Sequence, residues 1–367
     1  MDVFALFEAH VRAALAAEGA ITGVADPAGI TVETAREPGR GDLTTTAAMA
    51  FAAASGLPPR DLAERLAARL ARLPGVTRAE AAGPGFVNLS LAPAVWADVL
   101  AAILATGNAY GRSAAAPGGA ARVGRVEPEA IGLLDPDHGR QAVLADALAG
   151  LLEAAGRVVR RVPMVDGPRK ARTCGPVRVL SRGRPLGGVP SFGALAEEAG
   201  WDAVRFAMLS VPDEAPLALD LAALVDLSWD NPLFRVHYAH ARCRSAFRAA
   251  RETAAGLADR DALRSADFAL LVDERETMLL KRLARYPRLI GEAAAVHRPH
   301  RVAFYLGELA DDFHAYWNWG RNTPDLRFIR DESGSLTRAR LALVLGVETV
   351  LASGLALLGV SAPDELR

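Results

Sequence analysis

The sequence predicts a mostly helical α+β fold, in which a small α+β domain and a strand–helix–strand segment precede an all-α bundle. Three observations carry this prediction. Helical and strand patterns alternate through the first hundred residues, a strand–helix–strand pattern lies between residues 121 and 165, and only helical periodicity follows residue 194. About half of the 367 residues (51%) are apolar and 23% are charged, which suits a chain with a large packed core.

Residues 1–113 form the predicted small α+β domain. Apolar spacing predicts a helix over Val3–Ala17 and another after "GDLTTT", where Thr45 or Thr46 can cap the exposed amides. "PPRDLAERLAARLARLPG" is amphipathic, with proline at its start and glycine beyond its end. The short strands "VTRAEA" and "FVNLSL", joined by a Gly-Pro-Gly turn, precede a last helix in "PAVWADVLAAILATGNAYG".

Residues 114–193 begin with the linker-like stretch "AAAPGGAA". A strand in "ARVGRVE", a helix in "HGRQAVLADALAGLLEAAG" and a strand in "RVVRRVPMV" follow, and "VRVLSRGRPLGG" suggests a hairpin. Between Arg157 and Arg184 stand nine basic residues and one acidic residue, Asp166. Such a patch can attract phosphates on a protein of net charge −1, although a solvated strand-and-loop surface explains it equally well.

The remaining residues are predicted to be helical. In 194–229 two short helices are interrupted at Gly200, and 230–367 is the predicted bundle. The apolar run from Leu341 to Val360 contains Glu348 and indicates a buried bundle helix and no membrane span. The long helices of the bundle are expected at Asn231–Arg251, Ala262–Arg285, Pro299–Trp319 and Leu336–Leu358.

The ends and the cysteines indicate a cytoplasmic protein. The start, "MDVFALFEAH", has two acids and no basic apolar run, so we expect no secretory signal. Cys174 and Cys243 lie far apart and fit neither a disulfide framework nor a zinc spacing. Two histidine pairs at i, i+3 (His237/His240 and "HRPH" further on) lack a neighbouring cysteine or carboxylate ligand, so we expect no metal and no cofactor.

The helix "RVHYAHARCRSAFRAAR" carries the strongest indication of a ligand. Arginine forks bind phosphates and aromatic rings stack on unpaired bases, so its outer face suits single-stranded RNA. The alternative is an ordinary solvated face. The outer residues are Arg235, Tyr238, Arg242, Arg244 and Arg248, and the inner ones are Val236, Ala239, Cys243, Ala246 and Ala250.

Several stretches together resemble arginyl-tRNA synthetases. "VHYAHARCRSAF", "PHRVAFYLGELADDFHAYWN" and "RARLALVLGVETVLASGLALLGVSAP" resemble helices of that family's DALR-type anticodon-binding domain. "GDLTTTAAMAFA" and "AGPGFVNLSL" are similar to its amino-terminal domain, which touches the tRNA elbow. The resemblance covers 1–165 and 176–367 and implies that the strand–helix–strand segment is a residual Rossmann-like part of a class I catalytic domain.

The resemblance is weakest where the family binds ATP. "LDPDHGRQAVLADALA" aligns with the family's His-x-Gly-His signature, with Asp135 at the first histidine, Asp137 at the glycine and only His138 kept. A carboxylate 4 Å from a phosphate charge costs about 1 kcal/mol even in water. We therefore expect the ATP signature to be degenerate.

The family's catalytic domain is also expected to be mostly missing. Only 26 residues separate Asp166 from Gly193, whereas one βαβ unit needs about 30. The family's Lys-Met-Ser-Lys loop should fall there, but the nearest text is "SRGRP" and the whole chain has only Lys170 and Lys281. We expect a pseudoenzyme with no catalytic residues.

The resemblance implies a protein that binds tRNA, arginine tRNA above all, at three places. Phe86 and Asn88 would meet the tRNA elbow, and four arginines would follow the backbone. Three alternatives stay open: an adaptor for a protein partner or a homodimer, residual arginine–tRNA ligase-type activity, and new chemistry at the Asp135, Asp137 and His138 cluster. The expected anticodon contacts are Tyr238, His240, Arg242, His314 and Asn318, and the expected phosphate contacts are Arg157, Arg160, Arg161 and Arg169.

Overall fold

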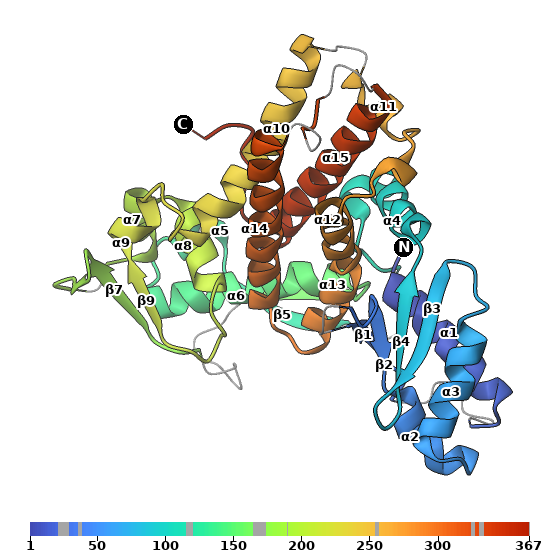
Figure 1. The fold of residues 1–367 in the computed structure, drawn as a ribbon. Helices are drawn as coiled ribbons and strands as arrows, with labels where there is room; N and C mark the ends of the chain where they lie inside the picture. Colours follow the sequence, from blue (N-terminus) through green and yellow to red (C-terminus); the bar gives the residue numbers. More distant parts are fainter. Residues whose placement is uncertain are drawn as a thin grey trace.

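The computed structural model describes residues 1–20, 29–35, 39–114, 120–163, 174–188, 190–253, 257–323, 327–329 and 334–366. The carboxyl-terminal helices form a central bundle, with the amino-terminal domain on one side and a small sheet on the other (Figure 1). The fold is mostly helical α+β, as expected. Arg169 and Lys170 lie outside the described residues.

The amino-terminal domain is an antiparallel sheet covered by helices. Its sheet order is β1-β2-β4-β3, and neighbouring strands are all antiparallel. The helices and the two longer strands were expected, whereas β1 and β2 are too short to show a pattern. The elements are α1 (Val3–Ala17), β1 (Val32–Thr34), β2 (Leu43–Thr45), α2 (Ala47–Ser55), α3 (Pro59–Leu70), β3 (Val76–Ala82), β4 (Phe86–Leu91) and α4 (Pro93–Thr106), followed by a 3-10 turn at Gly107–Ala109.

Strand β4 has one buried and one outward face. Val87 and Leu89 are fully buried against the helices, because alternate side chains of a strand point to opposite faces. Phe86 and Asn88 therefore belong to the other face. Of the two threonines expected to cap α2, Thr46 is the N-cap but its side chain makes no capping bond, whereas Thr45 Oγ1 accepts a 3.2 Å hydrogen bond from the Ala47 amide.

The middle of the chain contains two separate small sheets. Strands β5 and β6 are parallel and joined by α6, which confirms the predicted strand–helix–strand unit. Strands β7 and β8 form the predicted hairpin, and β9, which was not predicted, joins β7 in parallel. The elements are β5 (Ala121–Arg125), α5 (Pro128–Ile131), α6 (Pro136–Ala154), β6 (Val159–Pro163), β7 (Val177–Ser181), β8 (Arg184–Pro185), α7 (Phe192–Ala199), α8 (Trp201–Leu209), β9 (Leu217–Asp220) and α9 (Leu221–Val225).

The carboxyl-terminal bundle packs around α15. This helix is long and apolar enough to cross a membrane, but 83% of its most apolar window is buried inside the protein, as predicted for a bundle helix. It contacts α10, α14 and α12 of the bundle and α4 of the amino-terminal domain. The bundle helices are α10 (Pro232–Thr253), α11 (Arg260–Leu263), α12 (Glu274–Ala284), α13 (Tyr286–Ala295), α14 (His300–Asn322) and α15 (Gly334–Leu357), with a 3-10 turn at Phe268–Leu270.

One predicted bundle helix is wrong. The expected single helix over Ala262–Arg285 is divided into α11, the 3-10 turn and α12. Asp267 caps the turn, and Asp273 with Glu276 forms a capping box at the start of α12. These side chains satisfy the first amides of new elements, so they end the helix before them. A proline in the first turn of α13 then begins another helix that was not predicted.

Candidate functional site

The Asp135–Pro136–Asp137–His138 cluster begins helix α6. Asp135 is the N-cap: its Oδ1 accepts a 2.9 Å hydrogen bond from the His138 amide, and its Oδ2 lies 2.7 Å from His138 Nδ1. The hydrogen bond from the His138 amide is the main cause that lowers the pKa of Asp135. A carboxylate therefore already occupies the helix N-terminus, the position where phosphates bind in many nucleotide sites.

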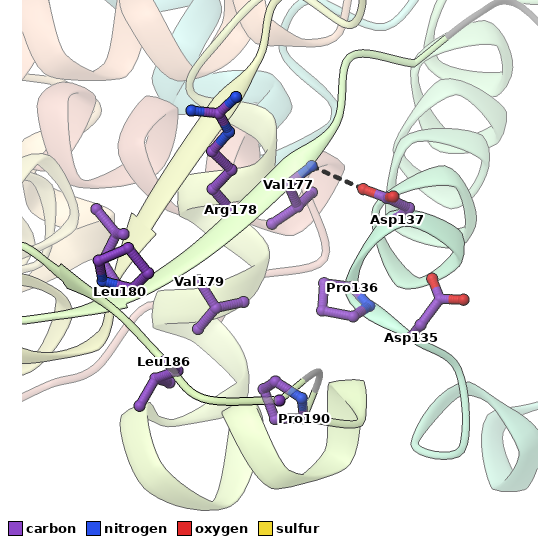
Figure 2. Close-up of a pocket in the computed structure, with 11 residues that line it drawn as sticks. Asp135, Pro136, Asp137, Val177, Arg178, Val179, Leu180, Leu186 and Pro190 are labelled. Atoms are coloured by element: carbon purple, nitrogen blue, oxygen red, sulfur yellow. Dashed lines mark hydrogen bonds between the residues drawn. The ribbon is translucent and has the colours of Figure 1, made fainter.

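Asp137 is held by the neighbouring sheet. Its Oδ1 accepts a 2.7 Å hydrogen bond from the backbone amide of Val177, the first residue of β7 (Figure 2). Both aspartates line an open cavity of about 440 Å³ between the start of α6 and the β7–β8 hairpin. The other lining residues are Pro136, Val177, Arg178, Val179, Leu180, Pro185, Leu186, Gly188 and Pro190.

This cavity has few groups that suit ATP. Its wall is apolar except for two carboxylates and Arg178. The described lysine, Lys281, lies elsewhere, where its Nζ pairs with Asp42 Oδ1 at 2.5 Å. A triphosphate placed here would meet two negative charges and one arginine, so the arrangement does not favour nucleotide binding.

The second candidate surface lies where α10 packs against α14. The Arg242 guanidinium lies 4.2 Å above the Tyr238 ring and 5.4 Å from the centre of the Trp317 ring. It also donates to Tyr238 Oη at 3.1 Å and to His314 Nδ1 at 3.0 Å. These contacts fix the guanidinium beside an open groove of about 650 Å³, which Arg248 and Arg321 also line.

His314 supports Arg242 from inside the bundle. Its Nδ1 accepts from Arg242, and its Nε2 donates to the Arg235 carbonyl at 3.0 Å, so both ring nitrogens are used by the neutral ring. Burial lowers the pKa of His314 to about 4. A neutral imidazole at this place leaves the full positive charge on Arg242.

Two of the expected tRNA contacts, His240 and His314, are buried. His240 and His314 are each only 4% exposed, and His240 Nδ1 donates to the Pro363 carbonyl at 2.8 Å. Helical spacing places both histidines on the helix faces that pack against the rest of the protein. Because histidine is polar, the sequence does not indicate this burial. Tyr238 and Arg242 line the groove, and Asn318 is exposed on α14.

Trp229 belongs to the same aromatic cluster and was not predicted. It is 49% exposed, and its ring contacts those of His314 at 4.8 Å and Tyr238 at 5.9 Å. Phe234 stacks on Tyr238 at 5.4 Å. The aromatic content of "SWDNPLF" just before the helix was the signal that could have indicated it.

Residues 361–366 lie along α10 and carry acids toward its arginines. His237 Nε2 donates to the Ser361 carbonyl at 3.0 Å. Arg244 pairs with Asp364 at 3.0 Å, and Arg248 with Glu365 at 3.3 Å. Part of the outer face of α10 is thus neutralised by the chain itself, which sequence spacing does not reveal.

The other expected contacts are distributed over two places. Phe86 is 37% exposed at the start of β4. Arg157 is exposed before β6 and Arg160 is exposed within it. Arg161 is also exposed, but its guanidinium pairs with Glu153 of α6.

Two family models match the chain. The model described as "Arginyl tRNA synthetase N terminal domain" matches residues 6–91. The model described as "DALR anticodon binding domain" matches residues 236–366. The first matched range contains β4 and the second contains all but the first four residues of α10, the elements that carry the candidate RNA surfaces.

Curated relatives align with the chain from end to end. Arginine–tRNA ligase of Azorhizobium caulinodans is 30% identical over 586 aligned residues, which cover 100% of both chains. The enzyme of Methylobacterium sp. strain 4-46 is 30% identical over 587, again with 100% of both covered.

Solved structures share the fold. Thermus thermophilus arginyl-tRNA synthetase has a TM-score of 0.74 at 16% identity, with 99% of this chain and 100% of that chain covered. The Plasmodium falciparum arginyl-tRNA synthetase has a TM-score of 0.69 at 8% identity, with 100% and 99% covered.

Proposed function

The chain belongs to the arginyl-tRNA synthetase family, and on that premise we propose that it binds tRNA, preferably arginine tRNA, without aminoacylating it. In this proposal residues 1–113 are the elbow-binding domain and 230–367 the anticodon-binding domain. Residues 114–193 are a truncated catalytic remnant and 194–229 are connecting helices. The protein would work in the cytoplasm.

The observation that carries the loss of catalysis is the N-cap of α6. Asp135 holds the first amides of the helix, and Asp137 holds the β7 amide 2.7 Å away. A phosphate could not take the place of either carboxylate without breaking these hydrogen bonds. New chemistry at the cluster finds no support either, because the described residues that line the cavity include no serine, cysteine or lysine that the Asp135–His138 pair could activate.

The length of the alignments supports a deletion. The chain has 367 residues, and its alignment with the Azorhizobium relative extends over 586, so at least 219 aligned positions have no residue of this chain. The split of the middle region into a β5–β6 pair and a β7–β8–β9 sheet agrees with a reduced catalytic domain.

The observation that supports tRNA binding is the Arg242 cluster. The guanidinium is fixed over Tyr238 beside a groove lined by two further arginines, while Trp229 leaves half of its surface exposed. Aromatic faces that stack on bases and arginines that bind phosphates or base edges are the groups that recognise unpaired RNA.

Two measurements test this function. Filter binding or gel shift with arginine tRNA and bulk tRNA should show a preference for arginine tRNA and a steep loss of affinity with salt. Arginine-dependent ATP–pyrophosphate exchange should be absent. Equal affinity for bulk tRNA would contradict the preference, and co-purification of one stoichiometric protein without RNA would favour the adaptor or homodimer instead.

A second candidate is residual arginine–tRNA ligase activity. The observation in its favour is family membership itself, because the relatives named arginine–tRNA ligase align over the full chain at about 30% identity. Any arginine-dependent exchange, or transfer of labelled arginine to tRNA, would establish it and refute the loss of catalysis.

A further inference from the structure

The two-stranded sheet β5–β6 is packed by α6 on one face, and two arginines of its other face are exposed. Helix α6 packs on both strands. Val123 is buried beneath it, and Arg161 pairs with Glu153 of the same helix, so odd-numbered residues face α6. Since side chains alternate, the even-numbered residues point the other way. Parallel strands are ordinarily covered on both faces, so an open face is unusual.

Two arginines stand side by side on this open face. Arg122 and Arg160 are direct partners in the register of the parallel pair, and both are exposed. Neighbouring strands lie about 4.8 Å apart, so the two positive charges are close. Arg157, also exposed, precedes the start of β6.

The arginines of this sheet differ in their partners according to the face. On the helix side, Arg161 pairs with Glu153, and Arg125 lies 3.7 Å from Glu127. On the open side, neither Arg122 nor Arg160 has a carboxylate partner within the part of the chain that the structure describes. Like charges opposite each other on a sheet destabilise it, so the pair lowers stability unless an anion neutralises it.

We infer that this face, centred on Arg122 and Arg160 with Arg157 beside it, binds the phosphate backbone of an RNA. The inference rests on the proposed tRNA-binding function and adds a site between the two end domains. A symmetric dimer through this face is disfavoured, because two arginine pairs would repel each other. An extended polyanion fits, since each guanidinium can bind one phosphate in a bidentate way.

A phosphate site has a specific signature. Phosphate contacts carry no sequence information, so losing them should weaken binding of arginine tRNA and bulk tRNA by the same factor. Each lost contact should also reduce the slope of log affinity against log salt, by about 0.7 to 0.9. A change in the Tyr238 cluster should instead reduce the preference between the two tRNAs.

The test compares two double variants of the full chain. Arg122→Gln/Arg160→Gln should lower affinity about tenfold at low salt and reduce the salt slope by about 1.4 to 1.8. Arg182→Gln/Arg184→Gln removes two exposed arginine charges from the β7–β8 hairpin, outside both domains assigned to tRNA, and controls for net charge. Its affinity and slope should change less.

The outcomes separate this inference from the proposed function. If the unaltered protein binds tRNA and the Arg122/Arg160 variant keeps its affinity and slope, the inference is wrong while the proposed function stands. A loss confined to arginine tRNA would also overturn it, as would an acidic protein that requires the same two arginines when RNA does not. If the unaltered protein binds no RNA, both fail.

A thermal melt completes the experiment. Removal of two neighbouring like charges should leave the melting temperature unchanged or raise it slightly. Weaker RNA binding by a variant with an unchanged or higher melting temperature then reports the lost contact and not unfolding.

Discussion

The Asp137 carboxylate of α6 accepts a 2.7 Å hydrogen bond from the amide of Val177, forty positions later in the chain. This bond attaches the start of the helix to the first residue of β7, and it lies at the edge of the cavity between α6 and the β7–β8 hairpin (Figure 2). Asp137 therefore takes a structural role here.

Asp137→Ala should destabilise the protein by about 1 to 2 kcal/mol, because the Val177 amide loses a charged acceptor. Asp137→Asn keeps an acceptor oxygen and should cost less. Urea unfolding measures both. Asp98→Ala, an exposed aspartate on α4, should change stability by less than about 0.5 kcal/mol. Equal effects at the two sites would contradict the role of Asp137.

Asp135→Ala should cost about 1 kcal/mol through loss of the N-cap, whereas Asp135→Asn should stay close to the unaltered protein near neutral pH. The folded state lowers the pKa of Asp135, chiefly through the His138 amide. The ionised carboxylate therefore adds stability that is present at neutral pH and lost as pH falls through the lowered pKa. Unfolding measured against pH should show a smaller acid loss for Asp135→Asn.

Tyr238→Leu should weaken binding of arginine tRNA by about tenfold or more, because it removes the ring that fixes Arg242 and supports the half-exposed Trp229, on which a base can stack for about 1 to 3 kcal/mol. Arg242→Lys should also weaken binding, because a lysine cannot keep the contacts to Tyr238 and His314 together. Filter binding gives both values. The preference for arginine tRNA should fall in each variant, and an unchanged preference would place recognition elsewhere.

Asp364→Asn/Glu365→Gln should raise RNA affinity a few-fold at low salt, and the gain should shrink as salt increases. The variant removes the acids that pair with Arg244 and Arg248 at 3.0 and 3.3 Å, while Arg244 keeps its pair with Glu348. Glu197→Gln/Glu198→Gln on α7 removes the same charge from an exposed surface and is the matched control. Equal gains would indicate a general effect of net charge.

Stability should fall as pH decreases from about 6.5 toward 4, in part through His314. Its folded pKa of about 4 lies below the ordinary 6.5, so the unfolded chain binds the proton first and gains stability over that range. The full contribution, on the order of 3 kcal/mol, is present above the higher value. His314→Asn should flatten this part of the profile. His237 and His300 also have lowered pKa values, so the difference between variant and unaltered protein is the quantity to measure.

Comparison with known proteins supports the family prediction, and the loss of catalysis and the truncation stay predictions. The relatives align over the whole chain, which favours the ligase-type alternative until activity is measured. The site geometry points the other way, because Asp135 and Asp137 are both engaged in holding α6.

Local patterns determined most of the elements of this protein. The amphipathic spacing of α3, the inner face of α10 and the apolar stripe of α15 were readable because each depends on the chain within a few turns. Capping side chains are also local. The caps at Asp267 and Asp273 lie in a run with helical spacing, so the spacing predicted one continuous helix there.

Only the tertiary structure decided which polar side chains face solvent. Arg160 and Arg161 are adjacent in sequence and equally basic, but one stands on an open sheet face and the other pairs with α6. His240 and Tyr238 lie on one helix. His240 is buried and hydrogen-bonded to the Pro363 carbonyl, whereas Tyr238 lines the groove. The physical reason is that burial and ion pairing depend on partners distant in the chain, which periodicity within one segment cannot identify.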